Sequence, residues 1–184
     1  MGTPRFDPTH SLEFNLDRGS VKLSGSIERV LLPADALAAL VRGADVETRR
    51  DFARRLGTEA GRRVAERIDG TAGIEAVAEH LGGEIALMGL GSLGFERWGG
   101  ALVATVHGSP FRAEGDEVLA GVLEGALQRG FGRNAAVVPI QRDDTLVRLL
   151  VVSASGAERV RGWLGAGLAF SDVLARLSGA GASS

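Results

Sequence analysis

The sequence predicts a mixed protein of α-helices and β-strands, of the α+β class, and three observations carry this prediction. A long segment, 46–68, has the periodicity of an amphipathic helix. A β-type run at 101–107 precedes a helical segment at 116–128. Two further β-type runs, 134–140 and 145–153, are joined by a short polar turn, which is typical of a hairpin.

The N-terminal part of the chain predicts an extended structure. Residues 1–10 contain two prolines and no periodicity, so we expect them to be flexible. Apolar and polar residues alternate over Ser11–Leu16, a turn follows at Asp17–Ser20, and Val21–Leu23 continues in extended form. This pattern predicts a β-hairpin or an extended arm. Ile27–Leu32 is apolar but short.

Helical signals fill the next part of the chain. Pro33 is placed to begin a short helix, and Asp45 is placed to cap the long one. A further short helix is predicted over Ile74–Leu81, ended by Gly82-Gly83. Glu84–Arg97 is rich in glycine and ambiguous, with a bulged strand as one interpretation.

Beyond the predicted hairpin, Ala157–Leu164 has a helical pattern, and Phe170–Leu177 is either another short helix or an arm. The last residues, 179–184, read GAGASS and are expected to be disordered. No stretch resembles an interdomain linker, so we expect one domain over 11–178.

The long helix carries an unusual pair of glycines. Gly57 and Gly61 lie one helical turn apart, and this spacing lets another backbone approach closely. The neighbour is either a helix of the same chain or a helix of a second subunit. An apolar stripe recurs every four residues beside these glycines, and its members are the candidate dimer interface: Phe52, Leu56, Ala60 and Val64.

Composition excludes several classes of function. The chain has no cysteine, which rules out disulfides and Cys-ligated metals. The formal net charge is −2, and the arginine-rich face of the long helix lacks aromatic residues, so we expect no nucleic-acid binding. No apolar run is long enough for a membrane span, and the N-terminus lacks a signal-peptide core. We therefore expect a cytoplasmic protein.

Candidate chemical motifs do not assemble into a site. Gly89–Gly94 matches the dinucleotide pattern G-x-G-x-x-G, but a β-type run follows it where a helix is needed. His10, His80 and His107 have no partner at metal-ligand spacing. Asp143 and its neighbour fit a turn role. We expect no catalytic residue, no metal and no cofactor, and hence a protein that is not an enzyme.

One local motif resembles a known family. The segment Ala120–Leu127, AGVLEGAL, resembles the glycine-containing helix of the small TRAPP subunits, whose architecture prokaryotic 4-vinyl-reductase domains share. The resemblance extends over residues 31–153. It implies an antiparallel sheet of about four strands packed against helices, and a homodimer formed through the first long helices. Gly121 and Gly125 match the family's glycines, where a side chain would collide with the sheet or a neighbouring helix.

The resemblance implies two functions for a bacterial member. The first is a dimeric scaffold or regulator whose protein partner is a small GTPase or a polarity or signalling protein. The second is a sensor that binds a small apolar ligand or lipid in its core; covalent acylation is excluded because there is no cysteine, and the family's haem ligation is not supported because there is no tyrosine. Six residues would line that pocket, or would simply fill the core: Leu102, Val118, Val122, Leu123, Leu127 and Val138.

Overall fold

A computed structural model describes residues 6–9, 11–23, 27–68 and 73–181, and it confirms the α+β class. The strands are β1 (Leu12–Asn15), β2 (Ser20–Leu23), β3 (Ile27–Arg29), β4 (Ser92–Trp98), β5 (Ala101–His107), β6 (Ala136–Arg142) and β7 (Leu146–Val152). The helices are α1 (Ala34–Gly43), α2 (Val46–Arg67), α3 (Ile74–Leu87), α4 (Asp116–Phe131), α5 (Ala154–Gly165) and α6 (Phe170–Gly181), with a 3-10 turn at Ala113–Gly115 before α4.

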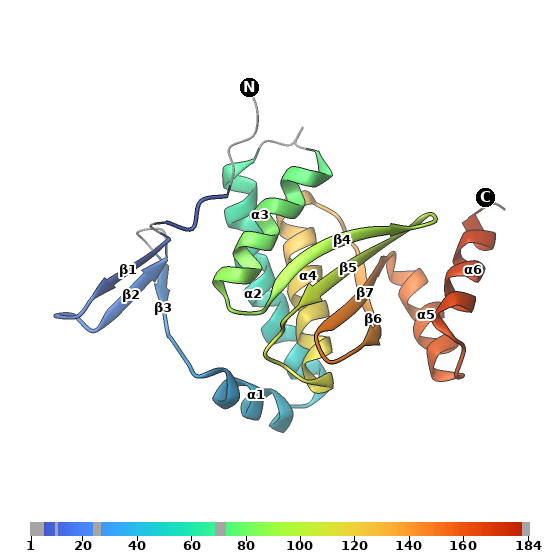
Figure 1. The fold of residues 1–184 in the computed structure, drawn as a ribbon, viewed down its shortest axis with the longest axis horizontal. Coiled ribbons are helices and arrows are strands. Elements are labelled where there is room, and N and C mark those ends of the chain that lie inside the picture. Colours follow the sequence, from blue (N-terminus) through green and yellow to red (C-terminus); the bar gives the residue numbers. More distant parts are fainter. Residues whose placement is uncertain (1–5, 10, 24–26, 69–72, 182–184) are drawn as a thin grey trace.

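The strands form two separate antiparallel sheets (Figure 1). β1, β2 and β3 make a three-stranded meander that projects to one side of the body, and we call this meander the arm. The body sheet has the order β4-β5-β7-β6. The hairpin predicted at the N-terminus therefore forms, and Ile27–Arg29 adds a third strand to it.

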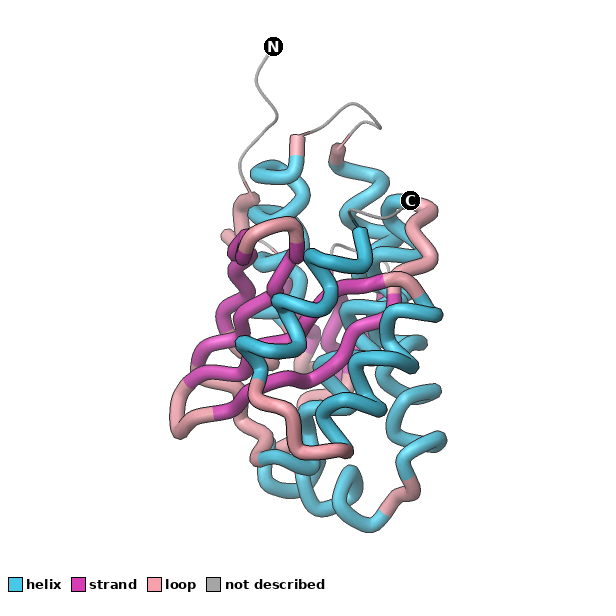
Figure 2. Tube along the Cα trace, turned by 90° about the vertical axis from the view of Figure 1, so that its right-hand side faces the viewer, coloured by secondary structure: helices cyan, strands magenta, loops and turns pink. Residues whose placement is uncertain are grey.

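Helices cover both faces of the body sheet. α2, α3 and α4 lie on one face, and the larger core cluster fills the space between them and the sheet, with Leu81, Leu123 and Leu149 among its buried members. α5 and α6 cover the other face, where they lie in front of the strands in Figure 2. A second cluster around Val103 and Val160 holds this side together. The alternation of side chains along each strand supplies both clusters.

α2 and α4 run side by side so closely that their backbones touch. A methyl group at Gly61 would lie 2.5 Å from the carbonyl oxygen of Ala126, and one at Gly121 would lie 2.7 Å from Cβ of Ala53. Gly57 and Gly125 are more crowded still, against the carbonyl oxygens of Val122 and Arg54. The four glycines singled out from the sequence thus meet across one helix pair within the chain. This contact fixes the orientation of α2 relative to α4, and with it the directions in which the charged and apolar faces of α2 point.

α3 is longer than the sequence predicts. It passes through Gly82-Gly83 and ends at Leu87, because the apolar stripe continues past the glycines with Leu81 and Ile85, which are both buried. Glycine in a helix costs about 1 kcal/mol relative to alanine, and the burial of these side chains outweighs that cost. The chain then turns through Gly89, at φ +69°, and enters β4, which pairs regularly with β5.

Both ends of the described chain are more ordered than the composition predicts. The Phe6 ring packs on α3, with its centroid 6.0 Å from that of His80, and the Arg67 guanidinium lies 5.2 Å above it. At the other end, α6 continues to Gly181. Residues 1–5, 10 and 182–184, for which flexibility or disorder was also expected, lie outside the described residues.

Candidate functional site: an apolar groove beside the arm

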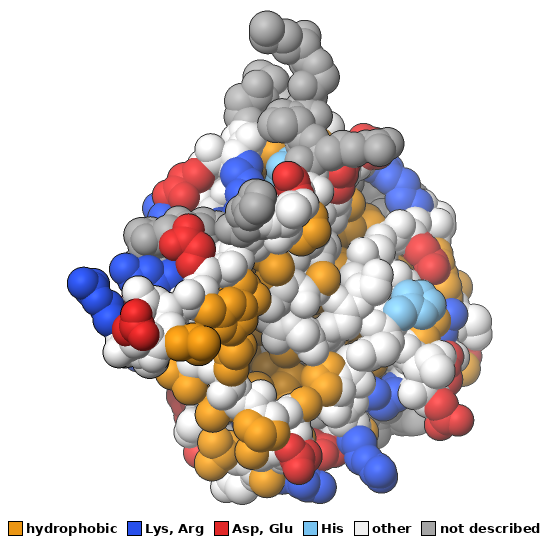
Figure 3. Space-filling view, turned by 60° about the vertical axis from the view of Figure 1, so that its left-hand side comes forward, with side chains coloured by type: hydrophobic (Ala, Val, Ile, Leu, Met, Phe, Trp, Pro, Cys, Tyr) orange, Lys and Arg blue, Asp and Glu red, His pale blue; other side chains and the backbone are white. Residues whose placement is uncertain are grey.

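The described surface carries a groove between the arm, α1, α2 and the end of α3. Its volume is about 420 Å³, and it is partly open to solvent. Figure 3 shows hydrophobic side chains gathered on this side of the molecule. Its apolar lining comes from six segments: Leu12, Leu23, Val30, Leu31, Leu32, Leu37, Phe52, Leu56, Leu87, Met88 and Leu90.

α2 lines the groove with one side and packs against α4 with a neighbouring side. Positions spaced three or four apart share one side of a helix. Phe52, Leu56 and Arg63 lie on the side that lines the groove. Gly57 and Gly61 lie on the side that contacts α4. The same helix therefore builds the core with one face and the groove with the other.

The segment between β3 and α1 borders the groove with unusually exposed apolar side chains. Val30 is 80% exposed, Leu31 is 61% exposed and Leu32 is 56% exposed. On α2, Phe52 is 40% exposed and lines the same groove. A cluster of exposed large apolar residues is typical of a binding surface, whereas single ones are common on any protein.

One end of the groove is charged. Arg63 lines it and is almost completely buried, and it pairs with the fully buried Glu84 of α3, whose Oε2 accepts from Nε of Arg63 at 2.6 Å. Arg67 also pairs with Glu84, at 2.5 Å, and Glu59 accepts from Arg63 at 3.1 Å. These pairs join α2 to α3, so the charged end of the groove is held by the body of the protein.

Two charged residues bordering the groove have shifted pKa values. Hydrogen bonds from Arg62 lower the pKa of the Glu59 carboxyl, in spite of the partial burial that acts against this. On β3, burial lowers the pKa of the Arg29 guanidinium, and the positive charge of Arg63 adds to that effect. Glu59 is therefore held as a carboxylate by its partners, while the carboxylates of Glu59 and Glu84 offset only part of the effect of burial on Arg29.

The residues predicted to line a core pocket do not gather around this groove. Val118, Val122, Leu123 and Leu127 of α4 are buried in the larger cluster, between α2 and the sheet. Val138 lies on the opposite face of the sheet, in the cluster under α5 and α6. Leu102 of β5 is half-buried and pairs with Val151. The groove is lined by none of the six.

The four residues predicted to form a dimer interface also separate. Ala60 and Val64 are fully buried within the chain, so a second copy cannot reach them while α2 and α4 stay packed. Phe52 and Leu56 line the groove. The sequence pattern identified the apolar stripe of α2, but it did not distinguish the residues that are buried within the chain from those that line the groove.

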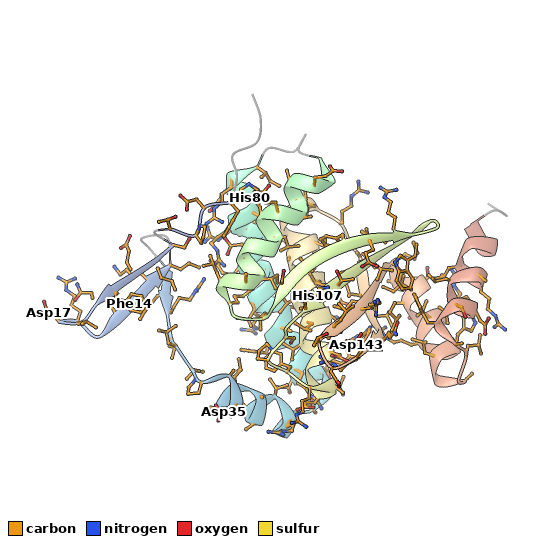
Figure 4. All side chains as sticks on the ribbon, viewed as in Figure 1. Phe14, Asp17, Asp35, His80, His107 and Asp143 are labelled. Atoms are coloured by element: carbon orange, nitrogen blue, oxygen red, sulfur yellow. The ribbon has the colours of Figure 1, made fainter. Side chains whose placement is uncertain are left out.

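His80, His107 and the acidic turn lie apart from the groove, and His10 lies outside the described residues. In Figure 4, His80 lies on α3 and His107 lies at the end of β5, whereas Phe14 and Asp17 lie on the arm. Asp143 accepts hydrogen bonds from the backbone of Thr145 and Leu146, as a turn aspartate does. Among the described residues, no group of three or more His, Asp or Glu side chains is arranged to hold a metal ion.

The described helices include none that is long and apolar enough to cross a membrane.

Sequence reasoning missed the groove itself. Its lining is drawn from positions as distant as Leu12, Arg29 and Met88. One local signal was present: the run Val30-Leu31-Leu32 is apolar, yet it is followed at once by the proline that begins α1. An apolar run too short for a core strand and too close to a helix start points to a surface role.

Comparisons with known proteins place the fold. No protein-family model matches the chain, and no curated protein matches it. Among solved structures, the chain is similar to the phenol-responsive sensory domain of the transcription activator PoxR, crystallised with phenol. The two chains are 18% identical with a TM-score of 0.56, and the match covers 80% of this chain and 92% of that domain. The chain thus shares the fold of that domain. Membership of the TRAPP and 4-vinyl-reductase superfamily remains a prediction.

Proposed function

We propose that this protein is a non-enzymatic regulatory domain that senses a small apolar ligand in the groove beside the arm. The observation that carries the proposal is the groove, whose volume of about 420 Å³ is lined mainly by leucine, valine, methionine and phenylalanine side chains. Ligand pockets are commonly about 300–1,000 Å³ and mostly apolar, with a few polar groups at one side. The groove has both features.

The structural comparison supports the same function. The similar domain of PoxR responds to phenol, which is itself a small, largely apolar molecule. The identity is low, so the comparison supports only the kind of function, and the groove is the site that we propose for it.

Binding of a neutral fluorescent probe tests the proposal. N-phenyl-1-naphthylamine should become brighter on the purified protein, and decanol should displace it. Leu31→Glu places a charge in the groove and should abolish both effects. Leu16→Glu is the matched control, because Leu16 is 90% exposed and lies outside the groove lining. Equal binding by wild type and Leu31→Glu would contradict the proposed site.

A homodimeric scaffold is the second candidate, and the arm is the observation that favours it. Phe14 is 58% exposed and Leu16 is 90% exposed on a hairpin that projects from the body (Figure 4). Exposed apolar side chains on a projecting strand pair are a common means of contact with another copy. Light scattering at micromolar concentration should then give the mass of a dimer, and Phe14→Ser with Leu16→Ser should give a monomer. A wild-type monomer would contradict this candidate.

A further inference from the structure

Four arginines lie at or beside the charged end of the groove, and three of them form ion pairs with glutamates there. Glu59 accepts from Arg62 at 2.8 Å and from Arg63 at 3.1 Å. Glu84 pairs with Arg63 and Arg67. On the outer side, Glu66 pairs with Arg62 at 2.5 Å. The three glutamates are therefore occupied by three arginines, all on α2.

Arg29 of β3 is the fourth arginine at this end. It lines the groove together with Arg63. Its side chain donates to the backbone oxygen of Glu28 at 3.4 Å, and within the described part of the chain it has no ion pair. Arg29 is half-buried beside apolar side chains of the groove, so water compensates its charge less well than on an open surface.

The neighbouring Glu28 does not supply the missing partner. Glu28 borders the groove too, but it stands directly opposite Lys22 in the pairing of β2 with β3. Successive side chains of a strand point to opposite faces, so Glu28 and Arg29 lie on different faces of β3. Burial and then the charge of Arg63 lower the pKa of Arg29, and the carboxylates of Glu59 and Glu84 offset only part of this effect.

We propose that the ligand of the groove is an amphipathic anion, such as a medium-chain or aryl carboxylate, whose head group pairs with Arg29 while its apolar body covers Phe52 and Leu56. This inference rests on the proposed function, because it assigns the class of ligand to the same groove. A carboxylate would give Arg29 the charge-assisted hydrogen bonds that no described side chain gives it. The apolar body would cover Phe52, which is 40% exposed without a ligand, and Leu56, which is half-buried.

Three ten-carbon probes that differ only in the head group test the inference: decanoate, decanol and decylammonium. Their affinities are measured on the full chain by calorimetry and by displacement of N-phenyl-1-naphthylamine, below the concentrations at which they form micelles. Decanoate should bind most tightly. Arg29→Gln should weaken decanoate by about ten-fold or more, since hydrogen bonds to charged groups contribute about 1.5–3 kcal/mol. Decanol should bind Arg29→Gln as it binds wild type, which also shows that the groove is intact.

Two further variants complete the test. Arg29→Lys keeps the charge and should retain most of the preference for decanoate. Arg18→Gln removes one positive charge from the turn of the arm, outside the groove lining, and should leave the affinities for all three probes unchanged. Equal affinity for decanoate and decanol, or tighter binding of decylammonium, would overturn the inference and leave the proposed function standing. Failure of all three probes to displace the dye would count against the proposed function itself.

Discussion

Gly125 of α4 lies directly against the backbone of α2, where a methyl group at position 125 would overlap the carbonyl oxygen of Arg54. The two helices approach this closely along several turns, because Gly57 and Gly61 face the same contact from the other side. Ion pairs reinforce the contact: Arg50 pairs with Glu117 at 2.7 Å, and Arg54 pairs with Glu124 at 3.1 Å.

Replacement of Gly125 by alanine should therefore destabilise the protein. The alanine would gain about 1 kcal/mol of helix propensity, but overpacking against a backbone costs about 1–3 kcal/mol or more, so we expect a net loss in the free energy of unfolding. Urea denaturation measures the change. Gly162→Ala in α5 is the matched control, since no atom lies within 4 Å of the added methyl, and it should stabilise the protein by up to about 1 kcal/mol. The same sign for both variants would contradict the close contact.

The buried pair Arg63–Glu84 predicts strong coupling between α2 and α3. Glu84→Leu leaves the buried guanidinium of Arg63 without its main partner, and the loss of one member of a buried pair costs about 3–5 kcal/mol. The double variant Arg63→Met with Glu84→Leu should lose less than Glu84→Leu alone, because no buried charge is then left unpaired at these two positions. Equilibrium unfolding of both single variants and the double variant gives the coupling. Additive losses would mean that the pair acts as two independent residues.

The N-cap of α2 predicts a stability that depends on pH. The backbone N–H of Thr48 donates to Asp45 at 2.9 Å, and its hydroxyl donates at 2.7 Å; these hydrogen bonds lower the pKa of Asp45. An unfolded aspartate has a pKa of about 3.9. Because the folded value is lower, the stabilisation is complete above the unfolded pKa and decreases as the pH falls through the folded pKa.

Asp45→Ala should accordingly be less stable than wild type at pH 7, and the difference should narrow in acid. Thermal unfolding followed over the range from neutral to acidic pH measures this difference. Asp45→Asn separates the charge from the cap, because asparagine caps helices through a neutral oxygen. Its advantage over Asp45→Ala should be the same at every pH. A constant difference between wild type and Asp45→Ala would contradict the lowered pKa.

The positions of the two tryptophans predict that tryptophan fluorescence does not change when a ligand binds in the groove. Trp98 packs on Phe170 with ring centroids 5.0 Å apart, and Trp163 lies under the guanidinium of Arg176, both on the side of the sheet covered by α5 and α6. The groove lies beyond α2, on the other side. Addition of decanol should therefore leave tryptophan emission unchanged, while Phe170→Ala should shift it. A change in emission on binding, in wild type, would place the ligand on the α5–α6 side.

The sequence supported prediction of the helices and strands better than prediction of the site. The stripe of Gly57 and Gly61 predicts close packing, and the order of elements predicts the sheet, because both depend on local spacing. Whether those glycines meet the same chain or a second copy depends on where α4 returns, which spacing cannot show. The groove was not predicted, because Leu12, Arg29 and Met88 meet only through the placement of the arm against α2 and α3.

The division of α2 into two faces has a consequence for which substitutions such a protein can accept during evolution. Substitutions at Gly57 or Gly61 act on folding, because no larger side chain fits there. Substitutions at Phe52 alter the shape of the groove, and Phe52 is not among the residues packed in the core between α2 and α4. One helix thereby lets the choice of ligand diversify independently of the architecture that supports it.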